Sequence, residues 1–269
     1  NINEKKIGMV GFGHLGSSIA EALVNKGFPK SNLMISHRGS IETTERVSDL
    51  KLESCVRDTE YLMKNSEVII LAARPQNIKE IAENCVRKDT LILSFMAALP
   101  LKALNSFFDC RILRVMCSGP ESISGGRGIS TLMPSDKDAC GFLKACGIRE
   151  FEVKNEDEID AFTAGICIPP ILMNLRVDRK ERDAALINMA LRFPVYRELS
   201  GWIEAELALS VLDNDKKSLE NVSTKGGVSE AMVSALLGGA SFLSSVERGV
   251  ERCAELRSEL CKNLAIRAA

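Results

Sequence analysis

The chain has 269 residues, of which 45% are hydrophobic and 26% are charged, and its formal net charge is −1. This composition is typical of a soluble globular protein of one or two domains. A protein that binds nucleic acid through the phosphates usually carries an excess of basic residues, so the balanced charge argues against a nucleic-acid partner. The longest apolar stretches, 161–175 and 235–243, are shorter than the roughly 20 residues that span a bilayer. We therefore expect no membrane interaction.

Nine cysteines and two histidines are scattered along the chain without a C-x-x-C pair or metal-ligand spacing. This pattern predicts no metal site and indicates free, mostly buried thiols in a reducing compartment. The first six residues are polar and lack the apolar core of a secretory signal. We therefore expect a cytoplasmic protein.

In the first half of the chain, short apolar runs alternate with amphipathic stretches. The apolar runs predict strands at 7–10, 33–36, 68–72, 91–95, 112–115, 129–132 and 151–153. Helices are predicted at 17–26, 43–49 and 77–85, and a further helix is expected to begin at a cap on Ser135 and to end at Gly147. This alternation predicts an α/β fold with a Rossmann-type, doubly wound parallel sheet covered by helices.

After about residue 155 the strand pattern disappears, and helical composition dominates at 156–166, 178–192, 201–212 and 229–264. Gly238 and Gly239 interrupt the last stretch, which is compatible with two helices. The sequence therefore predicts two domains, a dinucleotide-binding Rossmann domain at 1–155 and an all-α domain at 156–269.

The first apolar run is followed by a glycine-rich turn that matches G-x-G-x-x-G between a strand and a helix. In such turns the first glycine allows the sharp bend, the second lets the backbone approach a pyrophosphate, and the third lets the helix pack on the strand. The helix N-terminus then presents N–H groups to the phosphates. We therefore predict that a dinucleotide binds to Gly11, Phe12, Gly13, His14, Leu15 and Gly16.

The second predicted strand ends at Ser36-His37-Arg38, where NAD-binding proteins usually place Asp or Glu on the ribose 2′-hydroxyl. No acid is present there, and Ser40 lies close by in the sequence. A guanidinium group and hydroxyl groups suit a 2′-phosphate. The sequence therefore favours NADP(H) over NAD(H), with Ser36, His37 and Arg38 as cofactor-binding residues.

Five segments read I-G-M-V-G-F-G-H-L-G (7–16), V-I-I-L-A-A-R-P-Q (68–76), S-F-M-A-A (94–98), R-I-L-R-V-M (111–116) and N-V-S-T-K-G-G-V-S (221–229). They resemble segments of the pyrroline-5-carboxylate reductase family, in which the last four read V-I-L-A-V-K-P-Q, S-I-A-A-G, R-V-V-R-V-M and N-V-S-S-P-G-G-A-T. The resemblance extends over most of the chain and is weak from about 165 to 213.

The resemblance implies an NADP-dependent oxidoreductase that transfers hydride to the C=N bond of 1-pyrroline-5-carboxylate and gives L-proline, a step of amino-acid biosynthesis. The cofactor performs the hydride chemistry in such enzymes, and the protein orients it. The resemblance also implies a homodimer formed through the C-terminal helices. The further cofactor-binding residues that it implies are Ala72, Ala73, Arg74, Pro75, Met96 and Ala97.

On the substrate side, the resemblance implies that Ser229 is the catalytic hydroxyl, which hydrogen-bonds the ring nitrogen of the small-molecule substrate. It implies that Gly226, Gly227 and Val228 hold the substrate, because N–H groups of a glycine turn at a helix start bind a carboxylate well. Ser118 takes a further substrate position, where the family has an asparagine.

Three segments depart from the family pattern. Residues 117–120 read C-S-G-P in place of P-N-T-P, and Lys225 replaces the proline of the S-P-G-G turn. The third is 165–170, where the family's small polar S-G-S-G has become apolar. A pocket that loses its polar lining binds a small zwitterion less well.

Three alternatives follow from these departures. The first is a reductase of another cyclic imine or of a carbonyl substrate. The second is a non-catalytic dinucleotide-binding dimer. The third is a relative of the deazaflavin-dependent NADP oxidoreductases, which the turn at Gly226-Gly227 disfavours.

Overall fold

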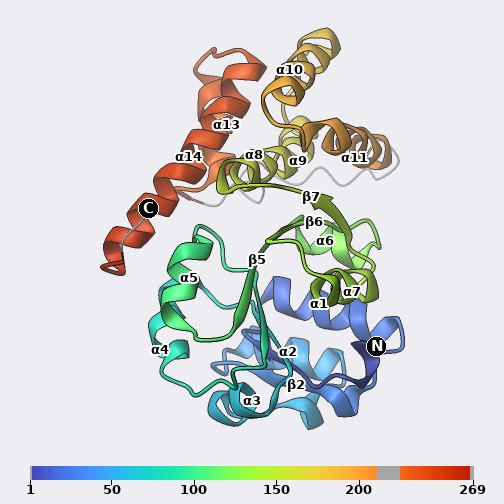
Figure 1. Cartoon of the computed structure of the whole chain (residues 1–269). Helices are drawn as coiled ribbons and strands as arrows, with labels where there is room; N and C mark the ends of the chain where they lie inside the picture. The colour runs from blue at the N-terminus through green and yellow to red at the C-terminus, as the bar shows by residue number, and fades with distance from the viewer. Residues whose placement is uncertain (1, 211–224, 267–269) are drawn as a thin grey trace. The chain divides into compact units, whose positions relative to one another are not determined.

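The computed structural model describes residues 2–210 and 225–266. The chain divides into two compact units, which are Asn1–Glu152 together with Leu260–Ala269, and Val153–Glu259. Figure 1 shows their helices and strands along the chain.

A seven-stranded sheet forms the centre of the first unit, in the order β2-β1-β3-β4-β5-β6-β7. Its strands are β1 (Ile7–Val10), β2 (Leu33–Ser36), β3 (Val68–Leu71), β4 (Leu91–Ser94), β5 (Arg111–Cys117), β6 (Ile129–Met133) and β7 (Arg149–Glu152). The predicted Rossmann-type sheet and its seven strands are confirmed.

One pair of strands departs from the predicted parallel arrangement. Strands β5 and β6 pair antiparallel, with Val115 opposite Leu132, whereas the other neighbouring strands are parallel. The connection between these two strands, residues 118–128, is shorter than the crossover of about a dozen or more residues that a parallel pair needs. The sheet is therefore mixed and mostly parallel.

Helices cover both faces of this sheet. Successive side chains of each strand point to opposite faces, so each strand contributes to two apolar clusters. Met9 and Ile70 pack in one apolar cluster with α1 (His14–Asn25), α2 (Ile41–Asp49), α6 (Pro120–Ser124) and α7 (Lys137–Ala145). Val10 and Ile69 pack in the other with α3 (Thr59–Asn65), α4 (Ile78–Ala82) and α5 (Leu101–Phe107). Short 3₁₀ turns complete the unit at η1 (Ile2–Glu4), η2 (Lys30–Asn32), η3 (Glu53–Cys55) and η4 (Pro75–Asn77).

The predicted cap of α7 was wrong by one residue. Asp136, not Ser135, is the N-cap, and its Oδ1 accepts hydrogen bonds from the backbone N–H groups of Asp138 (2.9 Å) and Ala139 (3.1 Å). A carboxylate also interacts favourably with the positive end of the helix dipole, which a hydroxyl does not.

The second unit is all-helical in the residues described, as predicted, with α8 (Glu156–Ile166), α9 (Ile168–Leu172), α10 (Arg179–Arg192), α11 (Tyr196–Ser210), α13 (Val228–Leu237) and α14 (Phe242–Asn263). The predicted break at Gly238 and Gly239 separates α13 from α14, and Gly239 has a φ of +87°. Helix α9 was not predicted. Its first turn contains Pro169 and Pro170, and prolines are tolerated there because the N–H groups of a first helical turn have no intrahelical partner. The predicted end of α11 at 212 lies outside the described residues.

All nine thiols are free, and five of them are buried while Cys85 is exposed. Among residues 2–210 and 225–266, no helix combines the length and apolar character that crossing a membrane requires.

Candidate functional site

The glycine-rich turn lies between β1 and α1, where two of its glycines are required by close packing. Gly11 has a φ of +95°, and a Cβ there would lie 2.5 Å from the backbone nitrogen of Ala73. A Cβ on Gly16 would lie 2.3 Å from the carbonyl oxygen of Gly11. Both positions therefore exclude larger residues, because real Cβ contacts are never this short.

Gly13 differs from these two because its surroundings are open. No atom lies within 4 Å of the position that a Cβ would take, and Gly13 is the N-cap of α1 without any side-chain cap. The N–H groups of the first helical turn are therefore not covered by a capping side chain. This geometry suits a dinucleotide pyrophosphate, which needs close backbone approach and N–H donors.

A groove of about 1060 Å³ opens at the carboxyl ends of β1, β2 and β3. Ligands of open α/β sheets bind at this end of the strands. The predicted cofactor residues that line it are Gly11, Phe12, Gly13, Ser36, His37, Arg38, Ala72, Ala73 and Arg74. The predicted residues that do not line it are His14, Leu15, Gly16, Pro75, Met96 and Ala97.

Several lining residues had no sequence signal, because they come from helices that follow the strands. Thr59 at the start of α3 hydrogen-bonds the hydroxyl of Ser36. Glu80 on α4 forms an ion pair with Arg38. The others that were not predicted are Val10, at the end of β1, and Thr43, Glu60, Gln76, Asn77, Ile81, Glu83, Asn84 and Cys85.

The groove end that was predicted to bind the ribose carries mixed charge. The side chain of Arg38 is 64% exposed and stands beside the Glu80 carboxylate. His37 accepts a hydrogen bond through Nδ1 from the N–H of Gly39 at 3.0 Å. The guanidinium group is therefore accessible to a 2′-phosphate, which would compete with Glu80 for it.

Ser118 lies in the interior of the first unit and is 1% exposed. Its Oγ accepts a hydrogen bond from Ser122 Oγ at 2.6 Å and another from the N–H of Ile129 at 3.1 Å. The hydroxyl is thus engaged within the protein. Met96 is also buried, whereas Ala97 is exposed.

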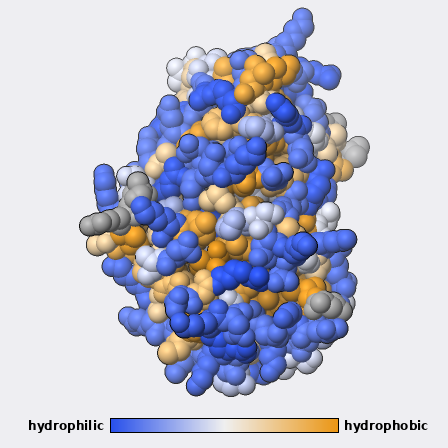
Figure 2. Space-filling model, viewed as in Figure 1, coloured by the Kyte–Doolittle hydropathy of each residue, from blue (hydrophilic) through white to orange (hydrophobic). Residues whose placement is uncertain are grey.

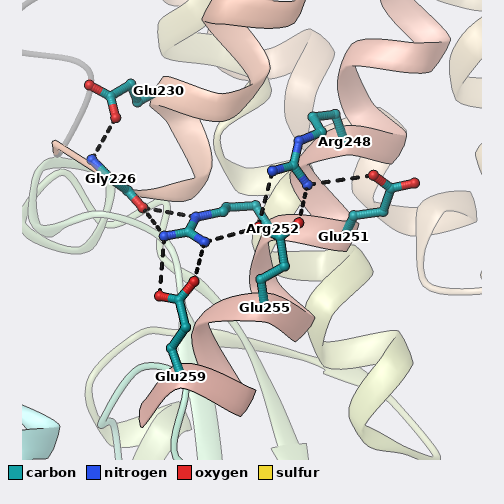
Figure 3. A network of polar contacts seen from close by, with 7 residues as sticks. All are labelled: Gly226, Glu230, Arg248, Glu251, Arg252, Glu255 and Glu259. Atoms are coloured by element: carbon teal, nitrogen blue, oxygen red, sulfur yellow. Dashed lines mark hydrogen bonds and ion pairs between the residues drawn. The ribbon is translucent and has the colours of Figure 1, made fainter. Parts of the chain in front are cut away.

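The predicted substrate turn, which belongs to the second unit, holds a network of charged side chains (Figure 3). Gly226 has a φ of +73°, and its N–H donates to Glu230 Oε2 at 2.6 Å. Its carbonyl oxygen accepts from Nε and Nη2 of Arg252 at 3.0 and 2.9 Å. Both backbone groups of Gly226 are therefore hydrogen-bonded within the chain.

Ser229, in the first turn of α13, stands next to a residue of the altered segment 165–170. Burial raises the pKa of the Cys167 thiol, and a hydrogen bond with the Ser229 side chain partly offsets this. The Cys167 thiol also donates to the carbonyl oxygen of Thr163 at 3.3 Å. Cys167, which stands where the family has a serine, therefore contacts the hydroxyl that was predicted to be catalytic.

Tyr196 adds a second buried polar group near this thiol. Among the described residues its hydroxyl has no hydrogen-bond partner, and complete burial, with Cys167 and Cys253 nearby, raises its pKa well above the ordinary value. A Cβ on Gly165 would lie 3.2 Å from this hydroxyl and 2.1 Å from the Leu199 side chain. Gly165 is therefore required by the packing of α8 against α11.

A second hollow, of about 510 Å³, is lined by residues at the amino ends of β3, β4 and β5. Four of its charged side chains form two ion pairs, Lys5 with Glu67 and Arg111 with Asp138. We regard it as an ion-paired surface at the end of the sheet away from the glycine turn. Within the described residues, no group of three or more His, Cys, Asp or Glu side chains is arranged to hold a metal ion.

In sequence, the chain matches one family model and several individual proteins. Residues 6–98 match the family described as NADP oxidoreductase coenzyme F420-dependent. Pyrroline-5-carboxylate reductase of Pasteurella multocida is 24% identical over 274 residues, which cover 96% of this chain and 98% of that protein. The ComE operon protein 4 of Bacillus subtilis is 25% identical over 121 residues, which cover 42% of this chain and 43% of that protein.

Solved structures with the same fold include pyrroline-5-carboxylate reductase from Coxiella burnetii, with a TM-score of 0.60, 20% identity, and coverage of 94% of this chain and 98% of that one. The pyrroline carboxylate reductase of Plasmodium falciparum with NADP bound has a TM-score of 0.55 and 20% identity, and covers 95% and 98% of the two chains. At such identities these structures establish the fold.

Proposed function

We propose that this chain, a distant relative of the pyrroline-5-carboxylate reductases, is an NAD(P)-dependent oxidoreductase that reduces the C=N bond of a cyclic imine with NADPH. The observation that carries the proposal is the open space around Gly13 in the glycine-rich turn, in the same groove as the accessible guanidinium group of Arg38. 1-Pyrroline-5-carboxylate, which would give L-proline, is the first substrate to test.

The first unit would hold the cofactor. Gly11 and Gly13 allow the pyrophosphate to approach the start of α1, with Phe12, His14, Leu15 and Gly16 completing the turn. Arg38, with Ser36 and His37, would bind the 2′-phosphate, which favours NADP(H) over NAD(H). NADPH, when bound, supplies the hydride. The other residues proposed to contact it are Ala72, Ala73, Arg74, Pro75, Met96 and Ala97.

Residues of the second unit would hold the substrate. Ser229 Oγ would hydrogen-bond the ring nitrogen and stabilise its proton while the neighbouring carbon is reduced. The turn at the start of α13 would hold the substrate through the backbone N–H groups of Gly226, Gly227 and Val228. Ser118, whose hydroxyl is engaged within the first unit, stays a weaker part of this proposal.

We also propose a homodimer formed through the C-terminal helices, a cytoplasmic location, and the two domains 1–155 and 156–269. Ile187 and Leu191 support the dimer, because they lie one turn apart on α10 and are 63% and 78% exposed. Figure 2 shows apolar residues at the surface near the top of the view, where Figure 1 draws helices of the second unit. Apolar side chains exposed side by side favour contact with a partner.

A second candidate function keeps the fold and changes the substrate to a different cyclic imine. The contact between Cys167 and Ser229 favours it, since the 165–170 segment lies against the proposed catalytic hydroxyl. A non-catalytic NADP-binding dimer is the further alternative.

The test is a titration of NADPH and of NADH, run beside NADPH oxidation with 1-pyrroline-5-carboxylate and with other cyclic imines. Imine-dependent oxidation of NADPH would support the reductase. Tight NADPH binding without oxidation by any imine would reject the reductase and leave the non-catalytic alternative. Failure to bind either cofactor would reject the dinucleotide site as well.

A further inference from the structure

We propose that the substrate is a cyclic imine without a carboxylate group, because the side chain of Glu230 already occupies the N–H of Gly226, one of the backbone donors proposed to hold a substrate carboxylate. This inference rests on the proposed imine reductase function. It assigns to Glu230 the role of a residue that determines substrate specificity.

The first argument is the hydrogen bonding of the turn. The N–H of Gly226 donates to Glu230 Oε2 at 2.6 Å, the short distance expected for a bond to a charged acceptor. An amide has a single N–H, so a substrate carboxylate could use this donor only by displacing Glu230. Glu230 lies on the third residue of α13, from which a carboxylate reaches back to the helix start.

The second argument is that the nearest guanidinium group is also occupied. Arg252 uses Nε and Nη2 on the carbonyl oxygen of Gly226. Its Nη1 donates to Glu255 at 2.9 Å and to Glu259 at 2.7 Å (Figure 3). No donor of this side chain points to a free position from which it could replace the lost N–H.

The third argument is the sign of the charge around the turn. Arg248 and Arg252 hold the pKa of Glu255 down to about 2, so this carboxylate is ionised at neutral pH. Glu255 is paired with Arg248 and Arg252 in the network of Figure 3, so it does not release either guanidinium group to a ligand. The cations near the turn include these two arginines and Lys225, and Glu230 is the carboxylate in contact with the turn itself. Glu230 would repel a second carboxylate placed beside it and would attract a protonated C=N group.

The altered segment on α8 and α9 points to the same substrate class. The side chain beside Ser229 is the thiol of Cys167, which is a weak hydrogen-bond donor and donates to Thr163. Its sequence neighbours Ile166 and Ile168 are apolar, and Ile168 is fully buried. The altered segment therefore adds no charged group beside Ser229 that could pair with a carboxylate.

Helix capping alone would also explain the contact between Glu230 and Gly226, and the variants are chosen to separate the two roles. Glu230→Gln keeps an acceptor at the same position and removes the charge. Glu251→Gln is the matched control, because it removes one charge from the same network at a side chain that is 69% exposed and that pairs with Arg248 and not with the turn.

The experiment measures kcat/KM with NADPH for 1-pyrroline and for 1-pyrroline-5-carboxylate. We expect the unmodified protein to favour 1-pyrroline by about tenfold or more, and Glu230→Gln to raise kcat/KM for the carboxylated imine by about tenfold without raising that for 1-pyrroline. Glu251→Gln should leave the ratio of the two within about twofold. Preference of the unmodified protein for the carboxylated imine, or an unchanged ratio in Glu230→Gln, would overturn the inference.

A binding measurement keeps the inference separate from the proposed function. If neither imine is reduced, the reductase proposal fails, and calorimetric titration of L-proline onto the NADP-saturated protein then tests the turn alone. Binding of L-proline to Glu230→Gln and not to the unmodified protein would support exclusion of carboxylates by Glu230. Binding to the unmodified protein, or to neither form, would contradict it.

Discussion

The guanidinium group of Arg38 and the carboxylate of Glu80 form an ion pair in the groove that we propose binds NADP(H). Arg38 follows β2, and Glu80 comes from α4, which packs on the opposite side of the groove mouth. Both side chains are about two-thirds exposed, at 64% and 67%. An exposed ion pair is weak, so a phosphate with two negative charges can take over the guanidinium group at small cost.

Replacing Glu80 should therefore strengthen NADPH binding. We expect Glu80→Gln to lower the Kd for NADPH about two- to fivefold, because an exposed pair is worth up to about 1 kcal/mol, and to leave the Kd for NADH unchanged. Fluorescence titration of both cofactors measures this. Glu83→Gln is the control, since Glu83 lines the same groove, whereas the carboxylate paired with Arg38 is that of Glu80. An equal gain in the control would assign the effect to net charge.

Arg38 itself should decide between the two cofactors. We expect Arg38→Asp to reverse the preference, since an aspartate repels a 2′-phosphate and accepts from a 2′-hydroxyl. The ratio of the dissociation constants of NADPH and NADH is the measurement. If NADPH is still preferred, the 2′-phosphate is recognised by other residues of the groove.

Ser229 should affect catalysis without affecting the cofactor. We expect Ser229→Ala to lower turnover of the preferred imine about ten- to a hundredfold, because the ring nitrogen loses the hydrogen bond that stabilises its proton. The Kd for NADPH should stay the same. Ser234→Ala, an exposed serine on the same helix, is the control. An unchanged rate in Ser229→Ala would remove this hydroxyl from the site.

The nucleotide half of the site could be predicted because its signals are local. A glycine pattern between an apolar run and a helix, and the absence of an acid near Arg38, are both visible in a few consecutive residues. Glu80 could not be predicted as a partner of Arg38, because the contact joins residues 42 positions apart through the packing of α4. The antiparallel pairing of β5 and β6 was missed for a similar reason, since strand direction depends on how residues 118–128 cross the sheet.

On the substrate side, one usable signal was overlooked. A glutamate at the third position of a helix that follows a glycine turn is a known capping pattern, so the contact of Glu230 with the turn was within reach of the sequence. The contact of Cys167 with Ser229 was not, because it depends on the packing of α8 against α13. The residues that set the chemistry of this turn thus come from helices far apart in the chain.

Ala98 offers a test of stability in the first unit. It has a φ of +59°, in the left-handed region that costs a residue with a Cβ about 1–2 kcal/mol. Ala98→Gly relieves this strain. The greater freedom of glycine in the unfolded chain cancels part of the stabilisation, which leaves the free energy of unfolding higher by about 0.5–1 kcal/mol. Thermal unfolding should show a Tm higher by about 1–3 °C. The neighbouring Ala97→Gly, at a residue without positive φ, should lower the Tm instead.

The exposed apolar pair on α10 tests the proposed dimer. If Ile187 and Leu191 are covered by a second copy of the chain, the double change to aspartate places two charges in an apolar contact and should convert the dimer to a monomer. Analytical ultracentrifugation measures the mass of both forms. Ile41→Asp is the matched control, because Ile41 is 75% exposed but lies on α2 of the first unit. A dimer that survives the double change would be held by another surface, and a monomeric unmodified protein would contradict the dimer proposal itself.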